Sequence, residues 1–299
     1  MARVAGFRFR VVGSMMNGLS LSGAGLRIGR AAAALFCLLS WAAPASGQIL
    51  YPFENHKRFS VSLGSDYSSG DYGEAKDTDI WYSSLGFKYE YERWTARVTV
   101  PWVRIEGPET ICMAFVAQPL VMFSEPHTDA SGETASTTVS GLGDVLASLT
   151  YTVLPVDASM PGVELTGKVK FPTASDGEYL GTGSYDFSFE AEVFKEFGRW
   201  TPYLNLGYRY MGNGLGVELD NVWFGSAGID LAVGTRTNVG LVYDFRQAAL
   251  GGIENSQELV PYTIYRFSES IRLMTYAVVG LSDSSADLGM GTNLSFSWE

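Results

Sequence analysis

Few residues of this chain have the type and spacing that catalysis needs. Many hydrolases and proteases use a histidine as a base beside a nucleophile or a carboxylate. The chain has two histidines, His56 and His127. His56 precedes the first expected strand, whereas His127 falls in a long connection close to Asp129, so they should lie far apart. Two neighbouring polar residues in a loop are ordinary, and the sequence therefore predicts that the protein is not an enzyme.

The sequence likewise contains no clear pattern for a metal or cofactor site. No cysteine and histidine residues have the spacing of a zinc site. Acidic residues gather in the first and last long connections, where carboxylates suit Ca²⁺ or Mg²⁺, but a solvated acidic loop is the simpler interpretation. They are Asp71, Glu74, Asp77 and Asp79, and then Asp283 and Asp287. We expect no cofactor and no metal.

A third set of candidates consists of charged residues that alternate with apolar ones. If the apolar face of each strand meets lipid, these residues line the interior of a barrel. The lumen-lining candidates are Arg97, Asp144, Lys168, Lys170, Asp186, Glu190, Arg209, Asp244, Arg246 and Arg272. Their signs are nearly balanced, so the charges either pair into a salt-bridged plug or line an open pore. The sequence leaves both interpretations open.

The elements that must position these residues are β-strands, because the dominant pattern has a period of two. Trp94, Ala96, Val98, Val100 and Trp102 are apolar and alternate with polar residues and a proline. Successive side chains of a strand point to opposite faces, so one face is apolar and has aromatic ends. The segments run to about ten residues, longer than the 5–6 of ordinary globular strands.

The connections alternate between short and long. Strands are expected near 58–67, 78–91, 94–103, 144–153, 163–171, 185–195, 200–210, 222–233, 238–246, 258–267, 271–281 and 288–298. Short periplasmic turns and longer extracellular loops are typical of transmembrane barrels, which also favour even strand numbers. The sequence therefore predicts an all-β, up-and-down antiparallel transmembrane barrel of about twelve strands. A soluble β-sandwich is the alternative that alternation alone would allow.

The two ends of the chain agree with export to the outer membrane. Residues 1–47 contain no acidic residue, carry five arginines, and continue into an apolar run that ends in small residues. This order is typical of a secretory signal peptide, so 1–47 should be removed and 48–299 should form the barrel. The start of translation could also be Met15 or Met16. The last strand ends with Trp298, close to the terminal aromatic residue that the barrel-assembly machinery reads.

Charge excludes one class of partner. The segment after residue 47 keeps all 32 acidic residues and 16 of the 21 basic ones, a net charge of −16. Nucleic-acid binding needs a basic face, so nucleic acid is excluded as a partner. The expected partners are outer-membrane lipids, lipopolysaccharide, the assembly machinery and a small solute.

The connection at 104–143 is unusually apolar for a loop. Its apolar residues include the lid candidates Met113, Phe115, Val121 and Phe123. One interpretation is a lid or constriction folded over the mouth of the barrel. The other is that the segment extends the third and fourth strands beyond the membrane.

Three patches resemble a known family of outer-membrane proteins. They are Ser140-Gly-Leu-Gly-Asp-Val145, then Lys170-Phe-Pro-Thr173 followed by Leu180-Gly-Thr-Gly-Ser-Tyr-Asp186, and then Trp200-Thr-Pro-Tyr-Leu-Asn-Leu-Gly-Tyr208. Together they resemble the "MetA-pathway of phenol degradation" family. The resemblance implies an outer-membrane barrel with a transport role for small, often aromatic compounds. It supplies no binding residues.

Two functions of different class follow from these observations. The first is a passive channel or transporter for small solutes, including aromatic or hydrophobic compounds. The second is a closed barrel with a structural or surface-interaction role and no transport activity.

Overall fold

The computed structural model describes residues 57–72, 76–108, 111–113, 121–123, 136–153, 160–174, 180–213 and 219–299. The strands are β1 (Lys57–Gly70), β2 (Thr78–Tyr91), β3 (Trp94–Pro108), β4 (Ile111–Met113), β5 (Val121–Phe123), β6 (Ser136–Leu142), β7 (Val145–Val153), β8 (Gly162–Phe171), β9 (Asp186–Phe194), β10 (Trp200–Tyr210), β11 (Val222–Ala232), β12 (Thr237–Arg246), β13 (Ser256–Arg266), β14 (Ile271–Gly280) and β15 (Leu288–Trp298). Within these ranges no helix is long and apolar enough to cross a bilayer.

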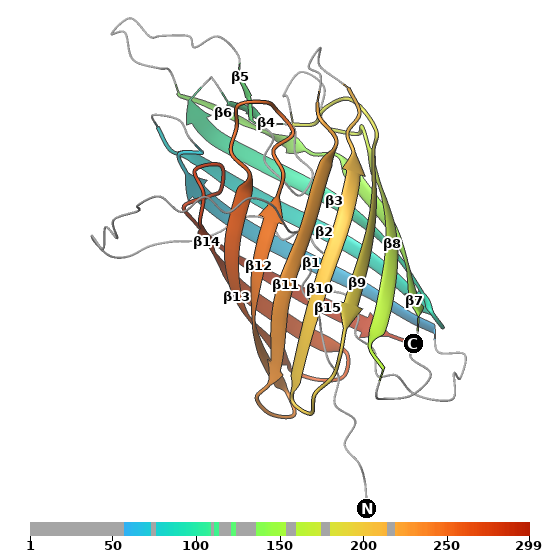
Figure 1. Cartoon of the computed structure of the whole chain (residues 1–299). Coiled ribbons are helices and arrows are strands. Elements are labelled where there is room, and N and C mark those ends of the chain that lie inside the picture. Colours follow the sequence, from blue (N-terminus) through green and yellow to red (C-terminus); the bar gives the residue numbers. More distant parts are fainter. Residues whose placement is uncertain are drawn as a thin grey trace, which may run out of the picture.

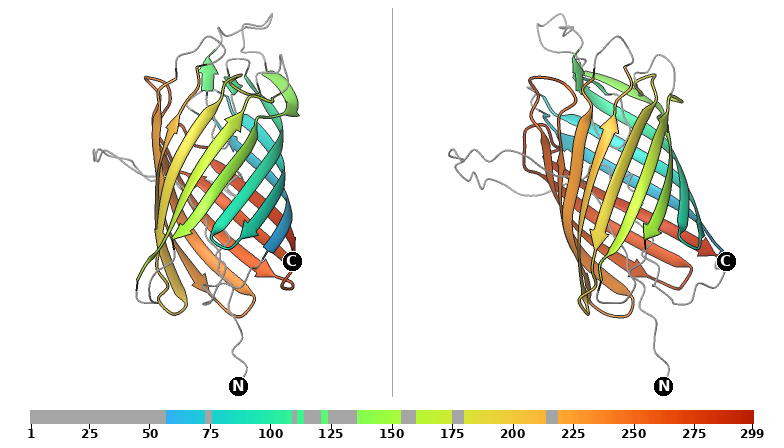
Figure 2. Two further views of the ribbon diagram at one scale, coloured as in Figure 1. Left: turned by 90° about the vertical axis from the view of Figure 1, so that its right-hand side faces the viewer. Right: turned by 45° about the vertical axis from the view of Figure 1, so that its right-hand side comes forward.

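Twelve strands close into an antiparallel barrel. Each strand from β7 to β15 pairs with the next, β15 pairs with β1, and β1, β2 and β3 continue the order back to β7. β6 and β7 are two parts of one barrel strand, because both pair with β3 on either side of Gly143-Asp144. The strands tilt around the barrel (Figures 1 and 2). β4 and β5 form a separate two-stranded ribbon.

The two ends of the barrel differ in their connections. Four neighbouring pairs are joined at one end by short turns at 92–93, 195–199, 233–236 and 267–270. We call this the short-turn end, and the opposite end the long-loop end. β1 begins and β15 ends at the short-turn end (Figure 1). In outer-membrane barrels the short turns face the periplasm.

Backbone conformation explains the tightest of these turns. Glu92 has a positive φ of 51° in the two-residue turn between β2 and β3. Two-residue hairpin turns need positive φ because only these turns follow the twist of the flanking strands. Gly198 fills the same need in the next short turn, with a φ of 60°.

Alternation along each strand separates an outer from an inner face. In β9 the side chains of Phe187, Phe189 and Val193 are exposed, whereas Asp186 and Ser188 are buried. The residues of β8 and β10 that pair with β9 follow the same alternation. The expected fold class, including the even number of barrel strands, is therefore confirmed.

The segment at 104–143 is a loop over less of its length than expected. β3 continues to Pro108 and pairs with β6 from Trp102↔Leu142 to Pro108↔Ser136. The strand-extension interpretation is thus correct at both ends of this segment. The alternation of Arg104 and Glu106 with Ile105, which is buried, marks the extension.

Candidate functional site

The outer face of the barrel is apolar from end to end. Every tryptophan in the described part of the chain is exposed, from Trp81 to Trp298. Leu165 and Leu206, both outward in the middle of their strands, are 48% and 50% exposed. Monomeric soluble proteins expose only small apolar patches. An apolar surface that surrounds a whole barrel is therefore incompatible with a water-soluble protein. The barrel therefore lies in a membrane, with this surface against lipid.

Aromatic rings form a group at each end of this surface. At the short-turn end the ring centroids of Phe59 and Tyr89 are 4.7 Å apart, and Phe59 also stacks on Trp298. At the long-loop end Tyr208 lies 4.8 Å from Trp223. Two such girdles mark the lipid–water interfaces of outer-membrane barrels, so this chain is a barrel of the bacterial outer membrane.

Inside the barrel, a charged cluster at the long-loop end centres on Lys170. Its Nζ lies 3.0 Å from a carboxylate oxygen of Asp144 and 3.2 Å from one of Asp186, and it also donates to the hydroxyl of Thr182. The other oxygen of Asp144 accepts hydrogen bonds from the backbone N–H groups at 173 and 174, each at 3.0 Å. Asp186 likewise accepts one from the N–H of Gly212. Three lumen candidates at the ends of β7, β8 and β9 thus hold the β8–β9 connection and the start of the connection after β10.

A second cluster lies on β12 and β13 at the same end. Asp244 on β12 lies directly opposite Glu258 on β13. Arg246 contacts both carboxylates, at 3.6 Å and 3.2 Å respectively. Arg209 on β10 donates to the hydroxyl of Ser188, and its guanidinium lies over the ring of Phe224. Sequence reasoning did not identify Glu258, which lies beside the proline-containing part of β13.

The remaining lumen candidates lie lower in the barrel. Lys168 and Glu190 form an ion pair of 2.7 Å between β8 and β9. Arg97 and Arg272 are partly exposed and lie toward the short-turn end, on β3 and β14. Lys88 and Glu90, which form an ion pair of 2.8 Å, lie near them. The ten candidates therefore do not form one site but occupy both ends of the barrel wall.

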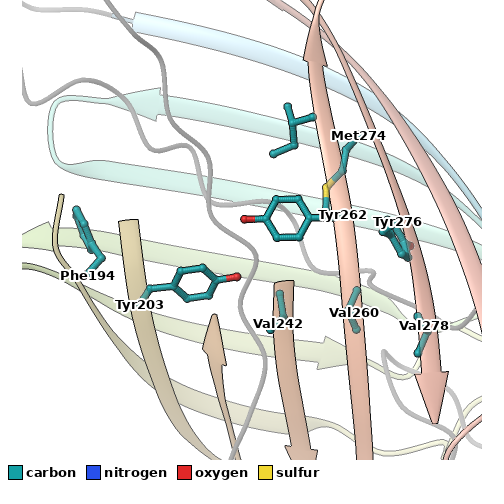
Figure 3. Packing of buried hydrophobic residues seen from close by; sticks show 9 residues of the cluster. Phe194, Tyr203, Val242, Val260, Tyr262, Met274, Tyr276 and Val278 are labelled. Carbon is teal, nitrogen blue, oxygen red and sulfur yellow. The ribbon is translucent and has the colours of Figure 1, made fainter. Parts of the chain in front are cut away.

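The inner face is not polar throughout, contrary to the expectation from alternation. β12, β13 and β14 carry inward apolar and aromatic side chains, which we call the apolar track (Figure 3). The track consists of Val242, Val260, Tyr262, Ile264, Met274, Tyr276 and Val278. These strands are apolar on both faces, so their sequence does not reveal which apolar residues turn inward.

Three inward tyrosines lie flat against the barrel wall. Tyr262 is directly opposite Gly240, Tyr276 opposite Gly291, and Tyr203 opposite Gly228. A Cβ at each glycine would collide with the ring of its tyrosine, so each ring occupies the space that the missing side chain leaves. A ring that fills the space over a glycine lies against the neighbouring strand and adds little bulk toward the axis.

Loops enter the barrel at the long-loop end. Leu180 of the β8–β9 connection is fully buried and belongs to a cluster with Tyr82 on β2, Val103 on β3, and Tyr72 and Ala286 from two other loops. This apolar cluster covers the wall of β2 and β3. Together with the Lys170 cluster it narrows the long-loop end on that side.

The acidic residues of the first and last loops approach one another. Burial, together with the charges of Asp71, Asp77 and Asp283, raises the pKa of Asp287 above its ordinary value. Within the described ranges, no group of three or more potential ligands is arranged to hold a metal ion.

Several predicted residues lie outside the described part of the chain. They are His56, Glu74, Phe115, His127, Asp129 and the whole of 1–47. Met113, Val121 and Phe123 are described as strand backbone only, in β4 and β5. The lid and the signal peptide therefore stay predictions.

Comparison with known proteins relates the fold to outer-membrane channels. No protein-family model and no curated protein matches the sequence. Among solved structures, the COG4313 outer membrane channel from Pseudomonas putida F1 matches with a TM-score of 0.60 and 15% identity over 82% of this chain and 96% of that one. The CymD monoaromatic hydrocarbon channel has a TM-score of 0.42 and 10% identity, over 82% of this chain and 88% of that one. The first of these matches shows that the two proteins share a fold.

Proposed function

We propose that this outer-membrane barrel is a passive channel for small solutes that have an apolar or aromatic part. The observation that carries the proposal is the apolar track inside a barrel whose outer face already supplies the apolar surface for lipid. Water-filled barrels have polar interiors. An inward apolar wall beside ion-paired walls favours solutes that are not fully hydrated.

The flat tyrosines support passage along this track. Because the rings of Tyr203, Tyr262 and Tyr276 lie over glycines, they add aromatic surface and little bulk at the axis. The lumen candidates Lys168, Glu190, Arg97 and Arg272 then form the polar wall of the same path. In this proposal the ion pair of Lys168 and Glu190 belongs to the wall of an open path and not to a plug.

The proposal includes the finer predictions from the sequence. The chain would be related to the MetA-pathway family, be exported by its 1–47 segment, and be inserted by the barrel-assembly machinery beside lipopolysaccharide. It would perform no catalysis. The likeness of its fold to the COG4313 outer membrane channel supports a channel.

Purified protein in liposomes tests the proposal. We expect discrete openings in planar bilayers and solute-dependent swelling that is faster for small aromatic solutes than for sugars of similar size. A folded protein that gives neither openings nor swelling would contradict the channel.

A second candidate is a closed barrel with a structural role. The observation that favours it is the filling of the long-loop end by the Leu180 cluster and by Lys170 with its two carboxylates. It predicts that no solute permeates and that loss of the protein alters envelope integrity.

Substitution of Gly240 by alanine should reduce flux. The new methyl group would take the place of the Tyr262 ring, which must then turn toward the axis. Overpacking of this kind costs about 1–3 kcal/mol, and we expect lower single-channel conductance. Gly251→Ala is the control, since a Cβ there meets no atom within 4 Å. Equal conductance of the two variants would show that the ring does not border the path.

A further inference from the structure

The inward cross-strand pairs of β13 and β14 change from aromatic to aliphatic to charged toward the short-turn end. Tyr262 lies opposite Tyr276, and Ile264 lies opposite Met274 one step nearer the short-turn end. The next inward pair is Arg266 and Arg272. A solute that moves down this wall therefore passes aromatic and aliphatic side chains and then meets two guanidinium groups.

The arginine pair belongs to a larger group of cations, which we call the basic arc. On β2 and β3, Lys88 lies directly opposite Arg97, and Arg58 on β1 lies next to these strands, opposite Glu90. Arg272 interacts electrostatically with Arg58, Arg97 and Arg266. The basic arc thus consists of Arg58, Lys88, Arg97, Arg266 and Arg272.

The basic arc has both neutral and acidic partners. Arg58 donates to the backbone carbonyl of Glu269, and Arg266 donates to the side-chain oxygen of Asn238. Glu90 forms an ion pair with Lys88 and interacts with Arg97 and Arg272. Asp230 interacts with Arg266, and Glu164 with Arg97. Asp230 also accepts hydrogen bonds from Asn238 at 2.5 Å and from Tyr262 at 3.0 Å.

This arrangement opposes the stability of the sheet. Like charges directly opposite each other on neighbouring strands are destabilising, and the basic arc contains two such pairs. At the long-loop end the balance is reversed, since Lys170 and Arg246 each lie between two carboxylates. Two pairs of like charges on neighbouring strands depart from this local rule, and such departures are expected at functional sites.

The side chains of the basic arc are accessible. All five are partly exposed, in contrast to the buried Lys170. Arginine binds carboxylates through two parallel hydrogen bonds, and such charge-assisted bonds are about twice as strong as neutral ones. A solute with an apolar body and a carboxylate could therefore contact the apolar side chains and the two arginines of β13 and β14 at the same time.

We propose, building on the channel function above, that the preferred solutes are small organic carboxylates with an aromatic or apolar body. The body passes along the apolar track while the basic arc attracts the carboxylate toward the short-turn end. Neutral hydrocarbons would gain from the track alone, and organic cations would be repelled by the arc.

Ion selectivity in planar bilayers tests this inference. With a gradient of potassium benzoate, we expect a reversal potential that reports higher permeability for benzoate than for potassium. Benzyl alcohol and benzylamine hydrochloride serve as neutral and cationic probes of similar size in liposome flux. Benzylamine should be the slowest of the three.

Variants of Arg266 and Arg272 test whether the basic arc causes the preference for benzoate. In Arg266→Gln/Arg272→Gln the benzoate-to-potassium permeability ratio should fall about tenfold, the effect of one lost charge-assisted hydrogen bond. Arg266→Lys/Arg272→Lys keeps both charges and should retain most of the preference. Arg104→Gln is the matched control, because Arg104 is exposed at the long-loop end and pairs only locally with Glu106.

The outcomes separate this inference from the channel function. A conducting channel that shows no preference for benzoate, or a glutamine variant that keeps the preference, would overturn the carboxylate inference and leave the channel. A folded protein without any conductance would overturn both. Removal of two like charges should not prevent folding, and the heat-dependent shift of a folded barrel in gel electrophoresis checks this for each variant.

Discussion

Replacement of Leu165 by arginine is expected to destabilise the folded barrel in lipid by about 2–4 kcal/mol, the cost of a cation near the bilayer midplane. Leu165 points outward from β8 and is 48% exposed on the apolar outer face. The measurement is the denaturant dependence of folding into lipid vesicles. Leu206→Arg, on the outer face of β10, should behave in the same way.

The neighbouring residue supplies the control. Thr166 points inward and lies directly opposite Glu190, so an arginine there faces water and a carboxylate. Thr166→Arg should therefore cost far less than Leu165→Arg. Equal loss of stability in the two variants would contradict the assignment of the outer face to lipid.

Replacement of Lys170 by methionine should cost about 3–5 kcal/mol, because loss of one partner leaves buried carboxylates without compensation. Asp144 and Asp186 would both remain at the long-loop end without the ammonium group that contacts them, and would keep the backbone N–H donors at 173, 174 and 212. The loops that they hold should loosen, so we also expect larger conductance at this end. Equilibrium unfolding and single-channel recordings measure the two effects.

A triple variant distinguishes loss of charge balance from loss of packing. In Lys170→Met/Asp144→Asn/Asp186→Asn the buried charges are gone, and most of the lost stability should return. Lys57→Met, at an exposed lysine at the start of β1, should change little. If the triple variant were less stable than Lys170→Met, the ion pairs would not be what fastens these loops.

The fold was predictable wherever one face of a strand meets lipid. The ranges 78–91, 200–210 and 288–298 agree with β2, β10 and β15 to the residue. Lipid on one side and water or ion pairs on the other enforce the alternation that the sequence displays. Beyond the membrane this contrast is reversed, since Arg104 and Glu106 are exposed and Ile105 is buried, so the extension of β3 to Pro108 lacks the apolar outer face of the other strands.

The interior was only partly predictable, for two physical reasons. Alternation identifies charged inward residues such as Lys170 one by one, but partners such as Asp144 and Asp186 depend on the register of neighbouring strands. Where an inward residue is apolar, as at Met274 and Val260, both faces of the strand look alike. The apolar track therefore emerges only from the three-dimensional arrangement.

The pairing of β1 with β15 has a consequence for the order in which the molecule assembles. This pairing joins Phe59 to Trp298, so the seam that closes the cylinder forms between the two most distant strands of the chain. Until β15 is in place, two rows of backbone N–H and C=O groups stay exposed, and hydrocarbon offers them no partner. Contacts between such distant segments form slowly because a long loop must first close. Loss of the final strand is thus not a local defect, since it leaves an open sheet that no bilayer can accommodate.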